Sequence, residues 1–330
     1  MASRKSGRAG WLLSGLGFGI AGGVALGTLV LAPAMEAGSS NSASSEIAPG
    51  SSESDIAEPK KSEADEKAIE IADAQAEAAD GVIADFASDA VGGSLDQRPV
   101  LILRTADADA ADVEAVARFV EQAGAEDSGQ ITLTEKFFDK DQADGLKSIV
   151  ANTLPAGAQL SEDKMAPGVH AGESLGAALM YDPETSEPIA SVDDRALVLQ
   201  TLREDGYIDY EDGTIRPAQG IILVSGDSDG AGEGSFAAKM LVDVATALDS
   251  RGNAVVLAGR IHSASDDGAI GILRADADGA GKVSTVDSVD RVWGQMATVL
   301  ALREQIDGGS GSYGAAASAE ASSPAPVAAE

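Results

Sequence analysis

Between Pro99 and Ile306 the sequence alternates short runs of apolar residues with longer segments of helical periodicity. Runs of four or five apolar residues are typical of strands that are buried on both faces. The clearest of these runs are 100–103, 221–225 and 254–258. Strands that alternate with helices build a largely parallel sheet with helices on both of its faces. We therefore predict an α/β domain over residues 98–306.

The remaining elements of this domain follow from the same reading. One helix is indicated by Val113, Val116 and Val120, and it ends at Gly124. Further helices are predicted at 142–152, 197–203, 235–248 and 292–306. Further strands are predicted at 131–134, 269–273 and 283–286, with an edge strand at 206–210.

The first 34 residues predict a membrane anchor or a signal. Three basic residues, Arg4, Lys5 and Arg8, precede an uncharged run from Gly10 to Ala32. As a helix this run would extend about 34 Å, enough to cross a bilayer core of about 30 Å. Its length favours one retained N-terminal transmembrane helix, whereas Ala32-Pro33-Ala34 resembles a signal cleavage site. In both alternatives the basic flank stays in the cytoplasm and the chain after Pro33 is exported.

A stripe of glycines lies within the uncharged run. Gly15, Gly19, Gly23 and Gly27 recur at every fourth residue, so one helix face is smooth enough for another helix to approach. The alternative reading is that glycine is simply frequent in this run. The stripe predicts helix association, and hence a homo-oligomer.

Residues 35–97 predict an acidic tether that is rich in serine and alanine. The segment 36–98 holds 15 acidic and 4 basic residues. Its first part is dominated by serine and reads as a solvated linker. Its second part has apolar residues at the 3–4 spacing of a coiled coil, which predicts a weak stalk. The seam consists of Ile69, Ala72, Ala76, Ala79, Ile83, Phe86 and Ala90. At the other end, residues 307–330 are predicted to be a disordered tail.

Charge and composition exclude several classes of function. The formal net charge is −31, and about −20 of it falls on the predicted domain. A negative field of this size repels phosphate backbones, so no nucleic-acid partner is expected. The chain has no cysteine, which excludes disulfides and thiolate chemistry, and it has only two histidines.

The loops show no arrangement that predicts catalysis or a metal site. Gly230, Gly232 and Gly234 lack the spacing of a phosphate-binding loop, and Asp227-x-Asp229-Gly230 lacks the later ligands of a calcium loop. We predict no enzyme, no metal site and no cofactor. If the domain binds a ligand, the carboxyl ends of its strands are the expected place. The residues there are Arg104, Asp107, Ser225, Asp227 and Arg260.

Several segments, in order along the chain, resemble the mycobacterial-type copper transport outer-membrane proteins of actinobacteria. They are Phe18-Gly19-Ile20, Leu103-Arg104-Thr105-Ala106-Asp107-Ala108, Leu154-Pro155-Ala156-Gly157, Gly172-Glu173-Ser174-Leu175-Gly176, Leu199-Gln200-Thr201-Leu202-Arg203, Arg274-Ala275-Asp276-Ala277-Asp278, Ser284-Thr285-Val286-Asp287 and Gly311-Ser312-Tyr313-Gly314. The resemblance implies a protein of the cell envelope that acts in copper efflux and is described for the family as pore-forming. Copper is then an ion to be transported, and the resemblance supplies no ligand set. Relatives usually carry a longer coiled coil after the anchor.

Two functional hypotheses remain open at this stage. In the first, the protein is a membrane-anchored component of copper export and copper homeostasis. In the second, it is a non-enzymatic envelope scaffold that binds a protein partner and affects copper only indirectly. A single anchor cannot line a channel unless several copies assemble, and the glycine stripe is the feature that favours assembly.

Overall fold

A computed structural model describes residues 63–252, 254–276 and 283–325. The predicted transmembrane helix, the glycine stripe (Gly15, Gly19, Gly23 and Gly27) and the serine-rich part of the tether lie outside the described residues.

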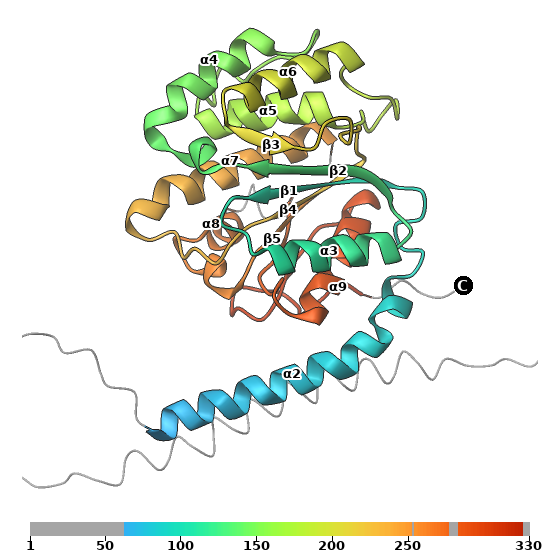
Figure 1. The fold of residues 1–330 in the computed structure, drawn as a ribbon, viewed down its shortest axis with the longest axis vertical. Helices are drawn as coiled ribbons and strands as arrows, with labels where there is room; N and C mark the ends of the chain where they lie inside the picture. Colours follow the sequence, from blue (N-terminus) through green and yellow to red (C-terminus); the bar gives the residue numbers. More distant parts are fainter. Residues whose placement is uncertain (1–62, 253, 277–282, 326–330) are drawn as a thin grey trace, which may run out of the picture. The chain divides into compact units, whose positions relative to one another are not determined.

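The described residues contain one seven-stranded sheet with the order β3-β2-β1-β4-β5-β6-β7. All neighbouring pairs are parallel except β2 and the edge strand β3, which are antiparallel (Figure 1). This confirms the predicted α/β fold with a largely parallel sheet. The strands are β1 (Pro99–Thr105), β2 (Glu126–Leu133), β3 (Ile208–Tyr210), β4 (Gly220–Val224), β5 (Val255–Ala258), β6 (Ser284–Val286) and β7 (Ser312–Tyr313).

Helices cover both faces of this sheet. One face packs against α3 (Ala110–Gln122) and α9 (Val292–Ile306). The other face packs against α4 (Ala143–Thr153), α5 (Pro167–Leu179), α6 (Val192–Glu204), α7 (Ser235–Gly252) and α8 (Ala269–Ala275). Short 3₁₀ turns follow several strands: η2 (Glu135–Phe138), η3 (Lys140–Gln142), η4 (Gly232–Gly234) and η5 (Ile261–Ala264).

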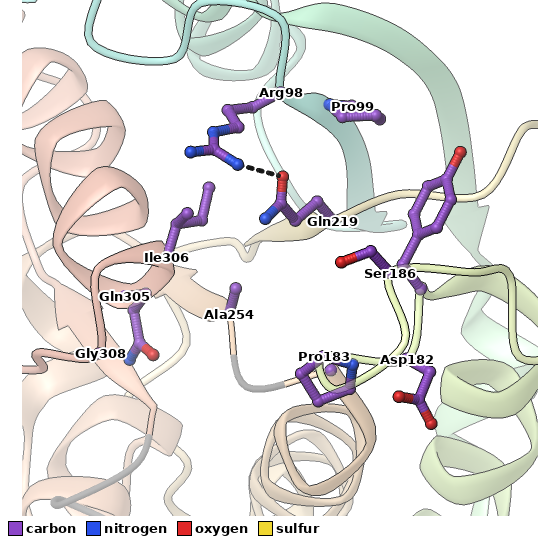
Figure 2. A pocket seen from close by; sticks show the side chains of 12 residues that line it. Arg98, Pro99, Asp182, Pro183, Ser186, Gln219, Ala254, Gln305, Ile306 and Gly308 are labelled. Carbon is purple, nitrogen blue, oxygen red and sulfur yellow. Dashed lines mark hydrogen bonds between the residues drawn. The ribbon is translucent and has the colours of Figure 1, made fainter.

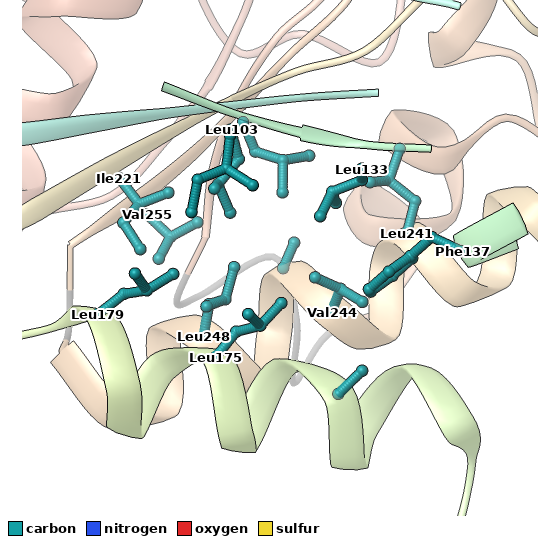
Figure 3. Close-up of a cluster of buried hydrophobic side chains, with 14 of the residues drawn as sticks. Leu103, Leu133, Phe137, Leu175, Leu179, Ile221, Leu241, Val244, Leu248 and Val255 are labelled. Carbon is teal, nitrogen blue, oxygen red and sulfur yellow. The ribbon is translucent and has the colours of Figure 1, made fainter. Parts of the chain in front are cut away.

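Alternating side chains of the central strands divide between two hydrophobic cores. In β1, Leu101 and Leu103 enter the core under α5 and α7, and Val100 and Ile102 enter the core under α3 and α9. Figure 3 shows the first core, in which Leu175 of α5 and Leu248 of α7 approach the strand residues. Because the strands are apolar on both sides, they appear in the sequence as continuous apolar runs.

Helix α5 is absent from the predicted elements, and glycine explains both the omission and the packing. Gly168, Gly172 and Gly176 lower the helical propensity of the segment. Each lies directly against α7: a Cβ added at any of the three would fall within 2.7–2.9 Å of an α7 atom. The glycines therefore allow the backbones of α5 and α7 to approach closely, a benefit that propensity cannot reveal.

Helix α2 (Glu63–Val91) continues through Gly81 and ends inside the domain. Its last turns bury Ala87, and Val91 and the following Leu95 lie in the core under α3 and α9. Asp80 also forms an ion pair with Arg291, at 2.8 Å from Nε to Oδ2. From Glu70 onward the described residues belong to one compact unit. The predicted tether boundary at 97 is therefore wrong, since the C-terminal part of this helix packs as part of the domain.

Two further predictions are wrong. Residues 269–273 are not a strand but belong to helix α8, whose Ala269, Ile270 and Leu273 pack at helical spacing into the first core. A five-residue apolar run fits either structure, and only tertiary packing decides between them. The tail is not disordered over 307–325: β7 pairs with β6, and Ser312 and Tyr313 are buried. Small residues are typical of disordered tails, but here they allow close packing: a Cβ added at Gly314 would lie 2.1 Å from Oδ1 of Asp287.

Candidate ligand site at the carboxyl edge of the sheet

The strand order reverses between β1 and β4. From β1 the chain passes through α3 to β2 on one side, and β4 leads through α7 to β5 on the other side. The loops that follow β1 and β4 therefore diverge and leave a crevice at their carboxyl ends. Ligands of open α/β sheets bind at such a switch point.

A cavity of about 610 Å³ lies at this position. The loop after β1 contributes Thr105 and Asp107, and the loop after β4 contributes Ser225. The 3₁₀ turns η2 and η4 add Glu135, Phe138 and Glu233, and α7 adds a wall that includes Ala238 and Leu241. The cavity is thus an apolar pocket with polar groups at the strand ends, the usual composition of a small-molecule site.

Two local contacts hold Asp107 at the mouth of this cavity. Thr105 donates a hydrogen bond from its Oγ1 to Oδ1 of Asp107. Gly226, directly after β4, lies so close that an added Cβ would be 2.4 Å from Oδ2 of Asp107. The glycine therefore allows the carboxylate from one strand end to lie over the next strand end.

Arg260 follows β5 and binds the beginning of α3. Its Nε donates to Oδ2 of Asp112 at 2.7 Å, and its Nη2 donates to Oδ2 of Asp109 at 2.8 Å. The hydrogen bond that Arg260 donates to Asp112 raises the pKa of the Arg260 guanidinium above its ordinary value. The amide of Ala111, which Asp109 caps at the helix N-terminus, lowers the pKa of Asp109, and Arg260 lowers it further. Arg260 therefore secures α3 to the sheet and does not line the cavity.

Asp227 and His262 form a pair beside the cavity. The Nδ1 atom of His262 lies 2.7 Å from Oδ2 of Asp227, and the backbone amide of His262 donates to Oδ1 at 3.1 Å. The hydrogen bond to Asp227 raises the pKa of the His262 imidazole. Because two thirds of the imidazole surface is exposed, this pair is accessible from solvent.

The structure divides the five predicted ligand residues into two groups. Asp107 and Ser225 line the cavity, whereas Arg104, Asp227 and Arg260 are not among its lining residues. Arg104 donates from Nη2 to the carbonyl of Ala108 at 2.7 Å, a contact within its own loop. That these residues bind a ligand remains a prediction.

Sequence reasoning missed Glu135, Phe138 and Glu233. Glu135 and Phe138 follow β2, so the rule of strand carboxyl ends could have found them. Glu233 lies nine residues after the end of β4, too far along the chain for that rule to select it. Its position in the cavity depends on the path of the glycine-rich loop after β4, which has no local signal.

A second cavity, of about 500 Å³, lies at the opposite, amino edge of the sheet (Figure 2). Arg98 and Gln219 lie on one side of it and share a hydrogen bond of 3.2 Å from Nη1 to Oε1. Asp182, Pro183 and Ser186 approach from the opposite side. Because open α/β sheets bind their ligands at the carboxyl edge, we take the first cavity as the candidate site.

Residues 63–252, 254–276 and 283–325 contain neither a cluster of metal ligands nor a candidate membrane span. No three histidine, cysteine, aspartate or glutamate side chains in these ranges lie close enough to hold a metal ion. His170 is buried, with its Nε2 3.0 Å from the carbonyl oxygen of Ser161. None of the helices in these ranges combines the length and apolar character needed to cross a bilayer.

Comparison with known proteins gives a consistent set of relatives. Residues 12–324 match the model of a protein family described as "Copper transport outer membrane protein, MctB". The copper transporters MctB of Mycobacterium tuberculosis (strain H37Rv) and Mycobacterium bovis are each 37% identical over 243 residues, covering 72% of this chain and 76% of theirs. The copper transporter MctB of Mycobacterium leprae is 34% identical over 235 residues, covering 68% of this chain and 72% of its own.

Proposed function

Because the chain belongs to the MctB family of copper transport outer membrane proteins, we propose that it acts in copper efflux as a membrane-anchored component of the cell envelope. The family relation carries this proposal and supports a role in copper transport. It rests on a match over residues 12–324, which begins inside the uncharged N-terminal run and extends through the whole α/β domain. In this proposal the N-terminal run anchors the chain, and the domain acts on the exported side.

The charge of the domain is compatible with cation transport. Residues 99–306 carry a net charge of about −20, so the domain raises the concentration of cations near its surface. One anchor cannot enclose a path for an ion, so the glycine stripe would have to assemble several copies. The proposal therefore couples the stripe Gly15, Gly19, Gly23 and Gly27 to transport.

The experiment is a gene deletion with measurement of cellular copper and of the rate at which copper-loaded cells release the metal. The deletion is expected to raise copper content, slow copper release and increase sensitivity to copper. The full chain should restore all three, and a chain with Gly19→Leu and Gly23→Leu should fail to do so. Gly10→Leu and Gly17→Leu, on the opposite face of the predicted helix, provide the matched control. Unchanged copper content in the deletion strain would contradict the proposal.

A second candidate function, partner binding, is favoured by helix α2. Its sequence holds nine acidic residues and one basic residue, and it exposes Val82 at 55% and Phe86 at 64%. Two copies of such a helix would repel each other, whereas a basic partner would gain both apolar contact and charge complementarity. Photocrosslinking from position 86 in cells should then join the chain to a different protein. Crosslinks only to a second copy of the chain would contradict this candidate.

A further inference from the structure

Three buried hydroxyl groups at the carboxyl-edge cavity already donate their hydrogens to acceptors within the protein. Thr105, Ser225 and Ser263 line the cavity and are 4%, 6% and 2% exposed. Thr105 donates to the Asp107 carboxylate, Ser225 to the carbonyl of Ala258, and Ser263 to the carbonyl of Arg260. A hydroxyl has one hydrogen and two lone pairs, so these groups can offer a ligand only their lone pairs.

The charged side chains of the lining have the same character. Asp107, Glu135 and Glu233 are its ionisable groups among the described residues, and all three are exposed carboxylates. An ionised carboxylate accepts hydrogen bonds and donates none. Glu233 lies in η4, two residues before the first residue of α7, so its negative charge is close to the positive end of that helix. The cavity therefore presents hydrogen-bond acceptors and negative charge together.

The exposed Ser228 also lines the cavity, and its Oγ accepts the backbone N–H of Gly230 at 3.3 Å; the other lining side chains are apolar. Phe138, Ala238 and Leu241 form a wall opposite the strand ends, and Ala238 and Leu241 are buried. Such a wall suits a short aliphatic stem. A ligand that fits the whole cavity must combine that stem with a positive group that donates several hydrogen bonds.

We propose that this cavity binds a small organic cation, an alkylammonium or alkylguanidinium, with its N–H groups on the hydroxyl oxygens and carboxylates and its stem against Phe138 and Leu241. The proposal goes beyond copper transport and does not depend on it. The chemistry could come from a free metabolite or from a basic side chain of another protein, and both would place the same cationic group in the cavity.

The test uses the full chain in detergent, without copper, and two probes of the same shape. n-Butylguanidinium carries the charge and the N–H donors, and n-butylurea replaces one nitrogen with a neutral acceptor oxygen. Ligand-observed NMR titration at 0.15 M salt should show the guanidinium bound about tenfold more tightly than the urea. Equal affinity of the two probes, or no binding of either, would overturn the proposal.

Variants locate the binding. Glu135→Gln together with Glu233→Gln should remove most of the preference for the cation, because both side chains are exposed and their loss leaves the fold intact. The matched control is Glu121→Gln together with Glu204→Gln, two exposed carboxylates on α3 and α6 outside the lining. The control should retain the preference. An equal loss in both double variants would show diffuse attraction to an acidic protein and overturn the proposal.

To separate the sources, a lysine-containing peptide and free cadaverine compete for bound butylguanidinium. Displacement by cadaverine alone assigns the cavity to a free amine, and displacement by both assigns it to any accessible basic group. Displacement by neither overturns the proposal.

Discussion

The carboxyl edge of the sheet has an open half and a closed half. At β1 and β4 the strand ends lead into the cavity, where Asp107, Glu135 and Glu233 are exposed. At β6 and β7 the strand ends are covered by residues 314–318. Hydrogen bonds to Asp287 and Arg274 hold these residues in place. Acidic residues follow strands in both halves. The two halves therefore differ in whether water reaches these residues.

In the closed half, the carboxylate of one aspartate accepts its hydrogen bonds from groups within the protein. Asp287, directly after β6, is fully buried and pairs with Arg274 at 2.7 Å from Nη1 to Oδ2. It also accepts from the amide of Ala315 at 2.7 Å and from the hydroxyl of Ser288 at 2.9 Å.

The arginine of this pair is equally engaged. Arg274 donates to Thr285 at 2.9 Å, to the carbonyl of Tyr313 at 2.7 Å and to the hydroxyl of Ser318 at 3.0 Å. Buried charges persist only when partners replace the water they lose. The carboxylates of the open half keep their water, so they remain available to a ligand.

The largest effect is expected where the closed half is broken. Asp287→Ala would leave the buried Arg274 guanidinium without a counter-charge, at a cost of about 3–5 kcal/mol in the free energy of unfolding. Urea denaturation of the full chain measures this cost. Arg274→Met combined with Asp287→Leu removes both charges, so it should cost less than Asp287→Ala alone. A loss below about 1 kcal/mol for Asp287→Ala would mean that the pair is not sealed from water.

An intermediate effect is expected at Arg260, which lies on the open half but binds a buried partner. Arg260→Met would leave Asp112, which is 6% exposed, without its guanidinium, at a cost of about 1–2 kcal/mol. The same denaturation experiment measures it, with Arg203→Met as the control, because the partners of Arg203 are exposed surface carboxylates. If both variants cost the same, the Asp112 contact is no stronger than a surface ion pair.

The sequence predicts the parts of the fold that depend on local patterns and misses those that depend on contacts between distant segments. The apolar runs of β1, β4 and β5 are continuous because those strands are buried on both faces, and they predicted the sheet. The tail was missed because its order depends on contacts with Asp287 and Arg274, which lie in distant segments of the chain. Helix α5 was missed because its glycines gain stability only against α7.

The sequence predicts where the candidate site lies, but it predicts only some of the residues that line it. The rule of strand carboxyl ends found Asp107 and Ser225, since each follows an apolar run. The same rule also selected Arg104 and Arg260, whose side chains bind their own loop and α3 instead. Which polar group after a strand faces the cavity depends on loop packing, such as the contact between Gly226 and Asp107.

The smallest effect is expected at the Asp227–His262 pair, because solvent reaches it and screens its charges. The folded pKa of His262 is raised above its ordinary value of about 6.5 by the hydrogen bond to Asp227. The stabilisation that the pair contributes is therefore fully present below about pH 6.5 and is lost as pH rises through the folded pKa. An NMR titration of the imidazole should give a His262 pKa above 6.5, and Asp227→Asn should return it towards 6.5. The other histidine, His170, is buried with its Nε2 3.0 Å from the carbonyl oxygen of Ser161, and its resonances at one fixed pH provide a control for the fold of the variant. If the His262 pKa were unchanged in the variant, Asp227 would act only as a cap on the η5 turn, through the backbone amide of His262.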